Sequence, residues 1–376
     1  MAGSVGAASG SGTVACCRDT FVSHARAILG RLSHRHRVTL IEPPELLELD
    51  GLARLAGPQL RQRLLCEVTL GERRLPVHAF VLGSDRPEAP AVGIFGGVHG
   101  LERIGAEVAI AYLRSLVMRL RWDETLHRQL ETLRLVFVPL VNPGGLVRGT
   151  RANPNGVDLM RNAPVDANER VPYLIGGQRI SAALPWYRGA LGAAMQAESE
   201  ALCRVVQEEL LPRPFSITVD CHSGFGLNDR VWYPFAHTAR PIEHLPEIHA
   251  LCETMDETLL HHRYVVEPQS RQYLAHGDLW DHLYLGAPPG SVFLPLTLEM
   301  GSWLWVRKNP RQLFSRHGLF NPMIEHRQQR VLRRHIGWLD FIARAACSHA
   351  RWLPTGARRE QHRALALARW YGARRR

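Results

Sequence analysis

The sequence predicts an α/β fold with a mixed, mostly parallel and twisted β-sheet that carries helices on both faces. The first observation is a set of short, continuous apolar runs, typical of strands buried on both faces. They occupy residues 91–96, 134–141, 215–221 and 291–298. The second observation is that segments with helical spacing of apolar residues alternate with these runs, as in sheets whose parallel strands are joined by helices. Since the sequence contains no internal repeat and no long polar linker, it favours a single catalytic domain.

The other expected elements follow in chain order. Residues 1–17 have the small-residue composition of a disordered N-terminus, and residues 18–33 have helical spacing. Two strand-like segments on either side of the turn sequence GERR predict a β-hairpin, at 65–70 and 76–82. A Gly-, Pro- and Asn-rich stretch without strong periodicity covers 142–190. The helices of the body are predicted at 103–119, 191–210, 245–261 and 323–346.

The composition and charge limit the possible classes of protein. The 376 residues carry a formal net charge of +11 and are 45% hydrophobic, which excludes a wholly disordered chain. Residues 326–376 contain 13 Arg and two acidic residues, a net +11, so residues 1–325 are neutral. We therefore divide the chain into a disordered start (1–17), one domain (18–346) and an Arg-rich C-terminal tail (347–376). Because the body is neutral and has no nucleic-acid-binding motif, we expect no nucleic-acid partner.

The cysteines and the terminal sequence predict the compartment. The seven cysteines have no spacing typical of a disulfide framework or of a cysteine-based zinc site. The N-terminus has no basic segment followed by an apolar one, so we expect no secretory signal. Without a run of 18 apolar residues, we also expect no membrane-spanning helix. These features predict a reduced, soluble, cytoplasmic protein. Lys308 is the only lysine, a bias typical of a GC-rich bacterial genome.

Ionisable residues follow three of the predicted buried strands. His99 and Glu102 come after the first strand, at the start of a predicted helix. Asp220 and His222 lie at the end of the third strand, and Glu299 follows the fourth. Because ligand sites of open α/β sheets form at the carboxyl ends of strands, these side chains can converge on one point. Two histidines and a glutamate with an open fourth position are the ligand set of a catalytic zinc ion.

Four sequence motifs in order resemble the zinc carboxypeptidases of the carboxypeptidase A type. They are GGVHGLE, NPGGLVRGTRANPNGVDLMRN (142–162), DCHSGFG (220–226) and LTLEMGS (296–302). The resemblance covers about residues 60–325. It implies a zinc-dependent hydrolase with one Zn²⁺ per chain, bound by His99, Glu102 and His222. It also implies that Glu299 is the general base that acts on a zinc-activated water, and the coding bias favours a bacterial, cytoplasmic branch of the family.

The resemblance implies three further roles. Arg151 matches the arginine that polarises the scissile carbonyl, and Arg161 matches the arginine that pairs with the terminal carboxylate of the substrate. Tyr273 is the best match to the mobile tyrosine that caps the substrate pocket, ahead of Tyr264 and Tyr284. The expected reaction is cleavage of an amide or peptide bond near a free carboxylate, in a peptide or an N-acyl amino acid.

Met160 departs from the family pattern, which usually has Asn immediately before the carboxylate-binding arginine. A methionine side chain cannot donate a hydrogen bond to a carboxylate. Two alternatives therefore stay open: an amide deacylase of the aspartoacylase or succinylglutamate desuccinylase type, and a murein-peptide amidase. Asp278 and Asp281 either favour a basic substrate side chain or cap the local helix. Asp220 is either an orienter of His222 or a strand-end cap.

Overall fold

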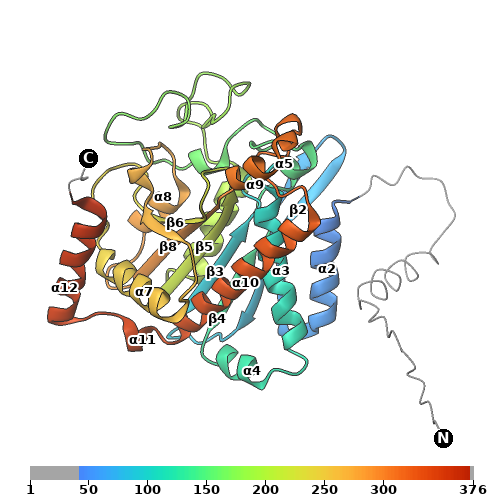
Figure 1. Ribbon diagram of the computed structural model, residues 1–376. Coiled ribbons are helices and arrows are strands. Elements are labelled where there is room, and N and C mark those ends of the chain that lie inside the picture. Colours follow the sequence, from blue (N-terminus) through green and yellow to red (C-terminus); the bar gives the residue numbers. More distant parts are fainter. Residues whose placement is uncertain (1–41, 373–376) are drawn as a thin grey trace, which may run out of the picture. The chain divides into compact units, whose positions relative to one another are not determined.

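The computed structural model describes residues 42–372 (Figure 1). The disordered start expected at 1–17 and the helix expected at 18–33 lie outside these residues. Within the described part, eight strands form one mixed sheet in the order β1-β2-β4-β3-β5-β8-β6-β7. The strands are β1 (Arg61–Leu70), β2 (Arg73–Gly83), β3 (Ala91–Gly96), β4 (Arg134–Val138), β5 (Phe215–Ser223), β6 (Arg230–Tyr233), β7 (Val265–Pro268) and β8 (Val292–Met300).

The sheet is parallel at its centre and mixed toward its edges. β4, β3, β5 and β8 are neighbours and run parallel to one another. The pairs β1–β2, β2–β4 and β6–β8 are antiparallel. β3, β4 and β5 are buried along their whole length, which explains their continuous apolar sequences. Because the central strands are parallel, the polar residues that follow β3, β5 and β8 lie at the same edge of the sheet.

Helices cover both faces of the sheet, as the sequence predicts. On one face α10 and α7 pack over Leu296 of β8, α3 lies beside α10, and α2 lies beside α3 (Figure 1). On the other face α8 places Trp280 against Phe95 of β3, with 5.1 Å between ring centroids, and α6 contacts α8. None of the helices within residues 42–372 is both long and apolar enough to cross a bilayer. The helices are α2 (Pro44–Ala56), α3 (Arg103–Arg119), α4 (Glu124–Leu130), α5 (Pro143–Arg148), α6 (Ala197–Glu209), α7 (Leu245–Thr258), α8 (Leu279–Leu285), α9 (Trp303–Lys308), α10 (Glu325–Cys347), α11 (His349–Trp352) and α12 (Gly356–Ala366).

The long predicted elements are present, with shifts at their ends. β3 and α3 begin and end at the predicted residues. β4 ends at Val138, three residues before the predicted end, because Pro139 has no N–H to donate to the sheet. α6 begins at Ala197 rather than at residue 191. The sequence pattern does not predict β6 and β7, which have four residues each and are too short for a clear periodicity.

The Arg-rich C-terminal segment is folded as far as the structure describes it. After α11 and α12, a π-helical turn spans Leu367–Tyr371. The Arg359 guanidinium Nε lies 2.6 Å from a Glu247 carboxylate oxygen of α7. Trp370 is buried, and its indole Nε1 donates to the Val266 carbonyl of β7 over 2.7 Å. The segment expected to be a tail therefore packs on α7 and covers the edge strand β7, whose backbone groups would otherwise lack partners.

Candidate metal centre and substrate pocket

The three predicted metal ligands lie where the loop after β3 meets the end of β5. His99 is in this loop, and Glu102 is the N-cap residue of α3. His222 is the second-last residue of β5. A Cβ on Gly105 of α3 would lie only 2.1 Å from the carbonyl oxygen of Cys221. Because this position has no side chain, α3 can approach β5 closely enough to bring Glu102 to His222.

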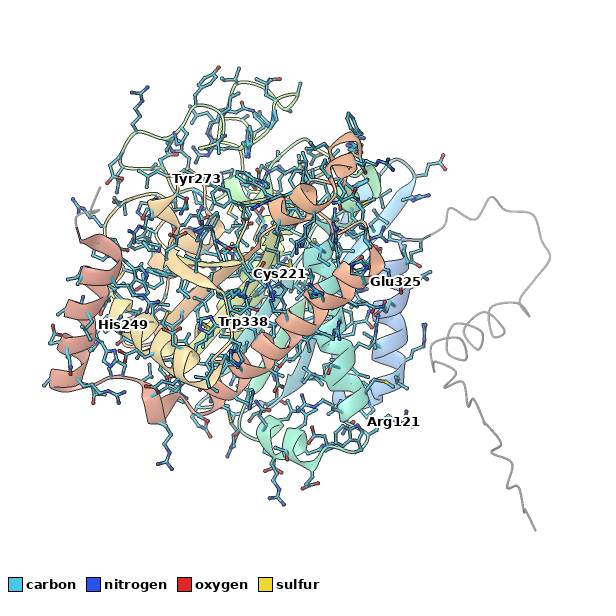
Figure 2. The ribbon with its side chains drawn as sticks, viewed as in Figure 1. Arg121, Cys221, His249, Tyr273, Glu325 and Trp338 are labelled. Atoms are coloured by element: carbon cyan, nitrogen blue, oxygen red, sulfur yellow. The ribbon has the colours of Figure 1, made fainter. Side chains whose placement is uncertain are left out.

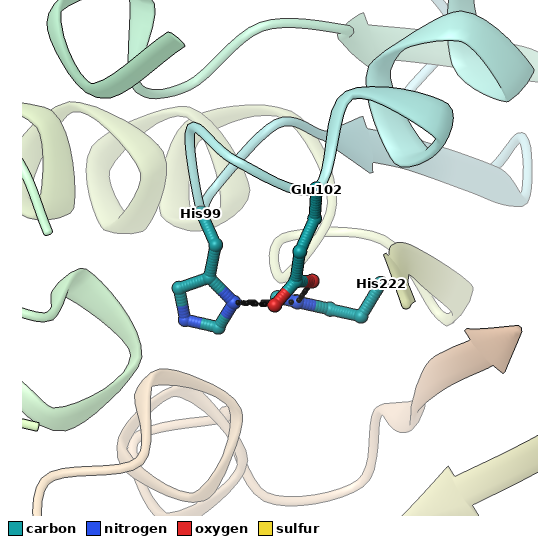
Figure 3. A group of neighbouring side chains, drawn as sticks. All are labelled: His99, Glu102 and His222. Carbon is teal, nitrogen blue, oxygen red and sulfur yellow. Dashed lines mark hydrogen bonds and ion pairs between the residues drawn. The ribbon is translucent and has the colours of Figure 1, made fainter. Parts of the chain in front are cut away.

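The donor atoms of the three residues converge (Figure 3). The His99 Nδ1 lies 2.9 Å from Glu102 Oε1, and the His222 Nδ1 lies 3.1 Å from Glu102 Oε2. The two Nδ1 atoms are 3.1 Å apart. All three side chains are buried. The arrangement offers one ligand atom from each residue at a common point, which we name the first His–Glu–His cluster.

Acidic residues hold the outer nitrogen of each histidine. The His99 Nε2 lies 3.1 Å from Asp158 Oδ1, and the His222 Nε2 lies 2.7 Å from Asp220 Oδ2. A carboxylate only accepts hydrogen bonds, so in the neutral form of each ring the proton lies on Nε2, toward its acidic partner. Both Nδ1 lone pairs then face each other and the Glu102 carboxylate. This convergence of unshared electron pairs fits a bound divalent cation, and zinc ligands typically have such acidic partners.

The pKa values of Glu102 and His222 also indicate that the first His–Glu–His cluster favours a bound cation. Burial opposes the ionisation of Glu102, but His99 and His222 hold the pKa of Glu102 below its usual value. Burial likewise lowers the pKa of His222, but Asp220 and Glu102 outweigh burial and raise that pKa well above its ordinary value. The carboxylates therefore attract a cation to this buried point, and a metal ion can take the place of the proton.

Arg151 and Asp158 support the cluster from one side. The Arg151 guanidinium donates from Nε to Asp158 Oδ2 over 2.7 Å and from Nη1 to Glu102 Oε1 over 3.0 Å. Asp158 also accepts the Met160 backbone N–H, which caps the short 3₁₀ helix Leu159–Arg161. One buried carboxylate thus positions His99, Arg151 and the Arg161 segment. Nothing in the sequence pattern predicts this role of Asp158, although it lies three residues before Arg161 in the same motif.

Glu299 lies directly across the strand pair from His222. These two residues are register partners in β5 and β8. Burial raises the pKa of Glu299 to about 8, with Glu102 and Asp220 adding to the rise and His222 and Arg151 opposing it. Its Oε2 atom has no hydrogen-bond partner among the described residues. A carboxyl with a high pKa and an unused oxygen beside the cluster is suited to proton transfer.

Arg161 and Tyr273 form one wall of a small pocket that opens beside the cluster. The Arg161 Nη2 donates to the Tyr273 hydroxyl over 3.3 Å, and the guanidinium carbon lies 5.8 Å from the centre of the tyrosine ring. The Tyr273 ring packs near Phe225 and Trp232. Arg161 is buried, and its Nη1 donates to the Met160 carbonyl. The pocket is lined by His99, Arg151, Met160, Arg161, His222, Trp232, Gln269, Tyr273, Asp278, Thr297 and Glu299.

The two aspartates of α8 have different surroundings. Asp281 accepts the backbone N–H groups of Ala236 and His237, so it holds the neighbouring loop. Asp278 caps α8 through Oδ1, which accepts the Trp280 and Asp281 N–H groups. The Asp278 Oδ2 has no hydrogen-bond partner among the described residues, and Asp278 lines the pocket. Burial, together with Asp281, raises the pKa of Asp278 to about 7. Asp278 is therefore both a helix cap and a pocket residue.

Two solved structures share the architecture of this chain. Thrombin activatable fibrinolysis inhibitor superposes with a TM-score of 0.59 at 16% identity, covering 80% of this chain and 71% of that chain. Carboxypeptidase A from Helicoverpa armigera superposes with a TM-score of 0.54 at 14% identity, covering 85% and 80%. At these identities the likeness demonstrates a common fold, the mixed sheet with helices on both faces.

Sequence comparison gives the family. Carboxypeptidase D of Anas platyrhynchos is 26% identical over 179 residues, which are 44% of this chain and 11% of that protein, so the match spans a small part of the relative. The sequence profile of the family Peptidase M14, zinc carboxypeptidase, matches residues 61–292. This range contains His99, Glu102, His222 and the pocket arginines, and it ends before Glu299. The chain belongs to the zinc carboxypeptidase family of metal-dependent hydrolases.

Proposed function

We propose that this protein is a zinc-dependent carboxypeptidase that cleaves a peptide bond next to a free carboxylate. The observation that carries the proposal is the first His–Glu–His cluster, in which Asp158 and Asp220 hold both histidines with Nδ1 toward Glu102. His99, Glu102 and His222 would bind one Zn²⁺ per chain. When bound in such a site, zinc lowers the pKa of a coordinated water to about 7 and polarises a carbonyl.

Glu299 is the proposed general base. It takes a proton from the attacking water and delivers it to the nitrogen of the leaving amine. Its position across from His222 and its free Oε2 atom support this role. Arg151 is the proposed stabiliser of the negative charge that develops on the scissile carbonyl oxygen. Loss of one such stabiliser typically lowers the rate by a factor of about 10²–10³.

Arg161 and Tyr273 are the proposed binders of the substrate terminus. The Nη2 of Arg161 faces the pocket and bonds the Tyr273 hydroxyl. A substrate carboxylate can replace this hydroxyl as the acceptor, because a charged acceptor forms a stronger hydrogen bond. The tyrosine ring would then move aside and cover the substrate. The variants Tyr273→Phe and Arg161→Lys test these roles. A rise in KM would indicate weaker substrate binding, whereas a fall in kcat would indicate a slower reaction step.

The substrate side chain would point toward Asp278. This buried carboxyl has an unused oxygen, and it is one of two acidic side chains that line the pocket, the other being the proposed base Glu299. A lysine or arginine side chain at the substrate terminus would pair with it and keep it ionised. We therefore propose a preference for peptides with a basic C-terminal residue.

Met160 supports a second candidate function, that of an amide deacylase or a murein-peptide amidase. This side chain lines the pocket and is buried, so no group at position 160 can donate a side-chain hydrogen bond to a substrate carboxylate. A substrate whose carboxylate needs only the Arg161 guanidinium as its partner would tolerate this change, and we propose an N-acyl amino acid or a peptidoglycan peptide as such a substrate.

A substrate screen with the zinc-loaded enzyme tests the proposal. C-terminal peptides, N-acyl amino acids and muropeptides are incubated with the wild type and with Glu299→Gln in parallel. We expect release of C-terminal amino acids by the wild type and loss of that release in the variant. Turnover of N-acyl amino acids or muropeptides without turnover of peptides would select the second candidate. Equal turnover by Glu299→Gln would contradict the role of Glu299.

A further inference from the structure

A second group of His, Glu and His side chains lies between α7 and α12. His249 and Glu253 are four residues apart on α7, so they share one face of the helix. His362 reaches this face from α12. Figure 2 places His249 between these two helices and away from Tyr273 of the substrate pocket. We name these three residues the second His–Glu–His cluster.

The donor atoms of the second cluster also converge. The His249 Nδ1 and the His362 Nδ1 are 3.1 Å apart, the same separation as in the first cluster. Each of these nitrogens lies 3.7 Å from a different carboxylate oxygen of Glu253. Two nitrogens bound tetrahedrally to zinc at 2.0–2.1 Å are about 3.3 Å apart. The pair of histidines therefore has the spacing of zinc ligands, and a side-chain rotation of Glu253 completes a three-residue set.

The two histidines of the second cluster are buried, whereas the glutamate is partly exposed. Both histidines are 5% exposed, whereas the Glu253 side chain is 45% exposed. The rotation of Glu253 is therefore unhindered by packing, and water has access from that side to fill a fourth position. Imidazole and carboxylate together are ligands typical of zinc and similar divalent transition-metal ions.

Few side chains of α12 itself are buried against the rest of the protein. α12 has 11 residues, below the length at which an isolated helix is stable in water. Only His362 and Ala366 of this helix are buried. Arg359 of α12 already pairs with the buried Glu247 of α7, and the buried Trp370 after α12 donates to the Val266 carbonyl of β7. A metal ion shared by α7 and α12 would add a direct link.

We propose that His249, Glu253 and His362 bind a second divalent transition-metal ion, of which Zn²⁺ is the probe, and that this ion fastens α12 to α7. The inference does not depend on the proposed function, since no residue of the second cluster belongs to the substrate pocket. In the metal-free protein, one histidine donates a hydrogen bond to the other, and the metal replaces that shared proton.

Counting bound zinc tests the site. The full chain is stripped with a chelator, given excess Zn²⁺, separated from free metal by gel filtration and analysed for zinc per chain. We expect two zinc ions in the wild type, one in His362→Gln and one in His99→Gln. Because the two variants lose different ions, a failure of the second cluster is distinguishable from a failure of the first. The control His261→Gln changes an exposed histidine after α7 and should keep two ions. Equal zinc content in wild type and His362→Gln would overturn the proposal.

Two measurements keep the test decisive if His362→Gln folds poorly. Glu253→Gln changes an exposed side chain and should lower the affinity of the second zinc at least tenfold in a chelator competition. Zinc should also slow amide hydrogen exchange in residues 356–371 of the wild type and of His99→Gln. If Glu253→Gln left the affinity for the second zinc ion unchanged, the proposed site would be contradicted. If zinc did not slow hydrogen exchange in α12, the proposed fastening of α12 to α7 would be contradicted.

Discussion

The two His–Glu–His clusters have the same donor types and the same 3.1 Å separation between Nδ1 atoms, but their surroundings differ. In the first cluster, Glu102 is buried and lies 2.9–3.1 Å from the histidines. In the second, Glu253 is 45% exposed and lies 3.7 Å away. The ligand set alone therefore does not make a catalytic site. The neighbouring groups decide whether a bound metal can take part in chemistry.

Three neighbours distinguish the first cluster. Asp158 and Asp220 fix the orientation of its histidines, and Glu299 provides a carboxyl with a raised pKa at the same strand end. The second cluster connects two helices and lies outside the substrate pocket. We expect rapid chemistry at the first site and a stabilising role at the second. Substitutions of these neighbours test the distinction.

The largest expected effect comes from Glu299→Gln. The amide cannot accept the proton of the attacking water, so kcat should fall by a factor of about 10²–10⁴. Zinc content should stay unchanged at both clusters, because Glu299 is not a ligand in the proposed site. The measurement is steady-state kinetics on the best peptide from the substrate screen, together with zinc analysis.

The matched control for this substitution is Glu200→Gln, which changes an exposed glutamate of α6. Its kcat should remain within a factor of two of the wild type. If Glu299→Gln retained more than a tenth of the wild-type kcat, the carboxyl would not be the general base, and the distinction between the clusters would lose its main chemical argument.

The next effect concerns Asp220→Asn. The substitution removes the negative charge that holds the His222 Nε2 at 2.7 Å, and loss of such a partner typically lowers metal affinity by a factor of about 10–100. Zinc affinity of the first cluster should fall by this amount in a chelator competition. The affinity of the second cluster in the same molecule is the internal control. Equal weakening of both ions would indicate a general loss of structure.

The sequence predicted the first cluster and not the second for a physical reason. His99 and Glu102 adjoin a buried strand that the apolar pattern reveals, and His222 and Glu299 end two more such strands, so their meeting follows from the parallel sheet. His249 and His362 are 113 residues apart, on helices with no strand to place them. Their meeting depends on how α12 packs on α7, and the sequence predicted only an Arg-rich C-terminal tail at 347–376.

Details within the first site were also beyond sequence reasoning. The position of Asp158 in the motif gave no indication that one carboxylate would contact both His99 and Arg151. The alternatives for Asp220, Asp278 and Asp281 depended on which atoms their oxygens contact. The structure places Asp281 in the loop scaffold, whereas Asp220 lies against His222 and Asp278 reaches the pocket.

The two clusters also differ in that only the first adjoins the substrate pocket. The variant Asp278→Asn tests the proposed role of this pocket. The amide can still cap α8 through its carbonyl oxygen, but it cannot form an ion pair with a basic substrate. The kcat/KM for a peptide that ends in Lys should fall about tenfold relative to the same peptide ending in Leu. An equal loss for both peptides would assign Asp278 to the scaffold alone and remove the proposed preference for basic residues.

The smallest expected effect, and the one that separates the candidate substrates, comes from Met160→Asn. The new amide N–H lies beside Arg161 at the pocket wall, where it can donate to a substrate carboxylate; a hydrogen bond to a charged group is worth about 1.5–3 kcal/mol before desolvation is subtracted. After that cost we expect kcat/KM for a C-terminal peptide to rise about threefold, with most of the change in KM. An N-acyl amino acid that binds only through Arg161 should gain nothing, because no second donor is needed.

Met160→Leu keeps the apolar volume and is the control for packing. If Met160→Asn lowered kcat/KM for peptides while Met160→Leu did not, the apolar wall would itself be part of substrate recognition, and the deacylase or murein-peptide amidase would become the better assignment.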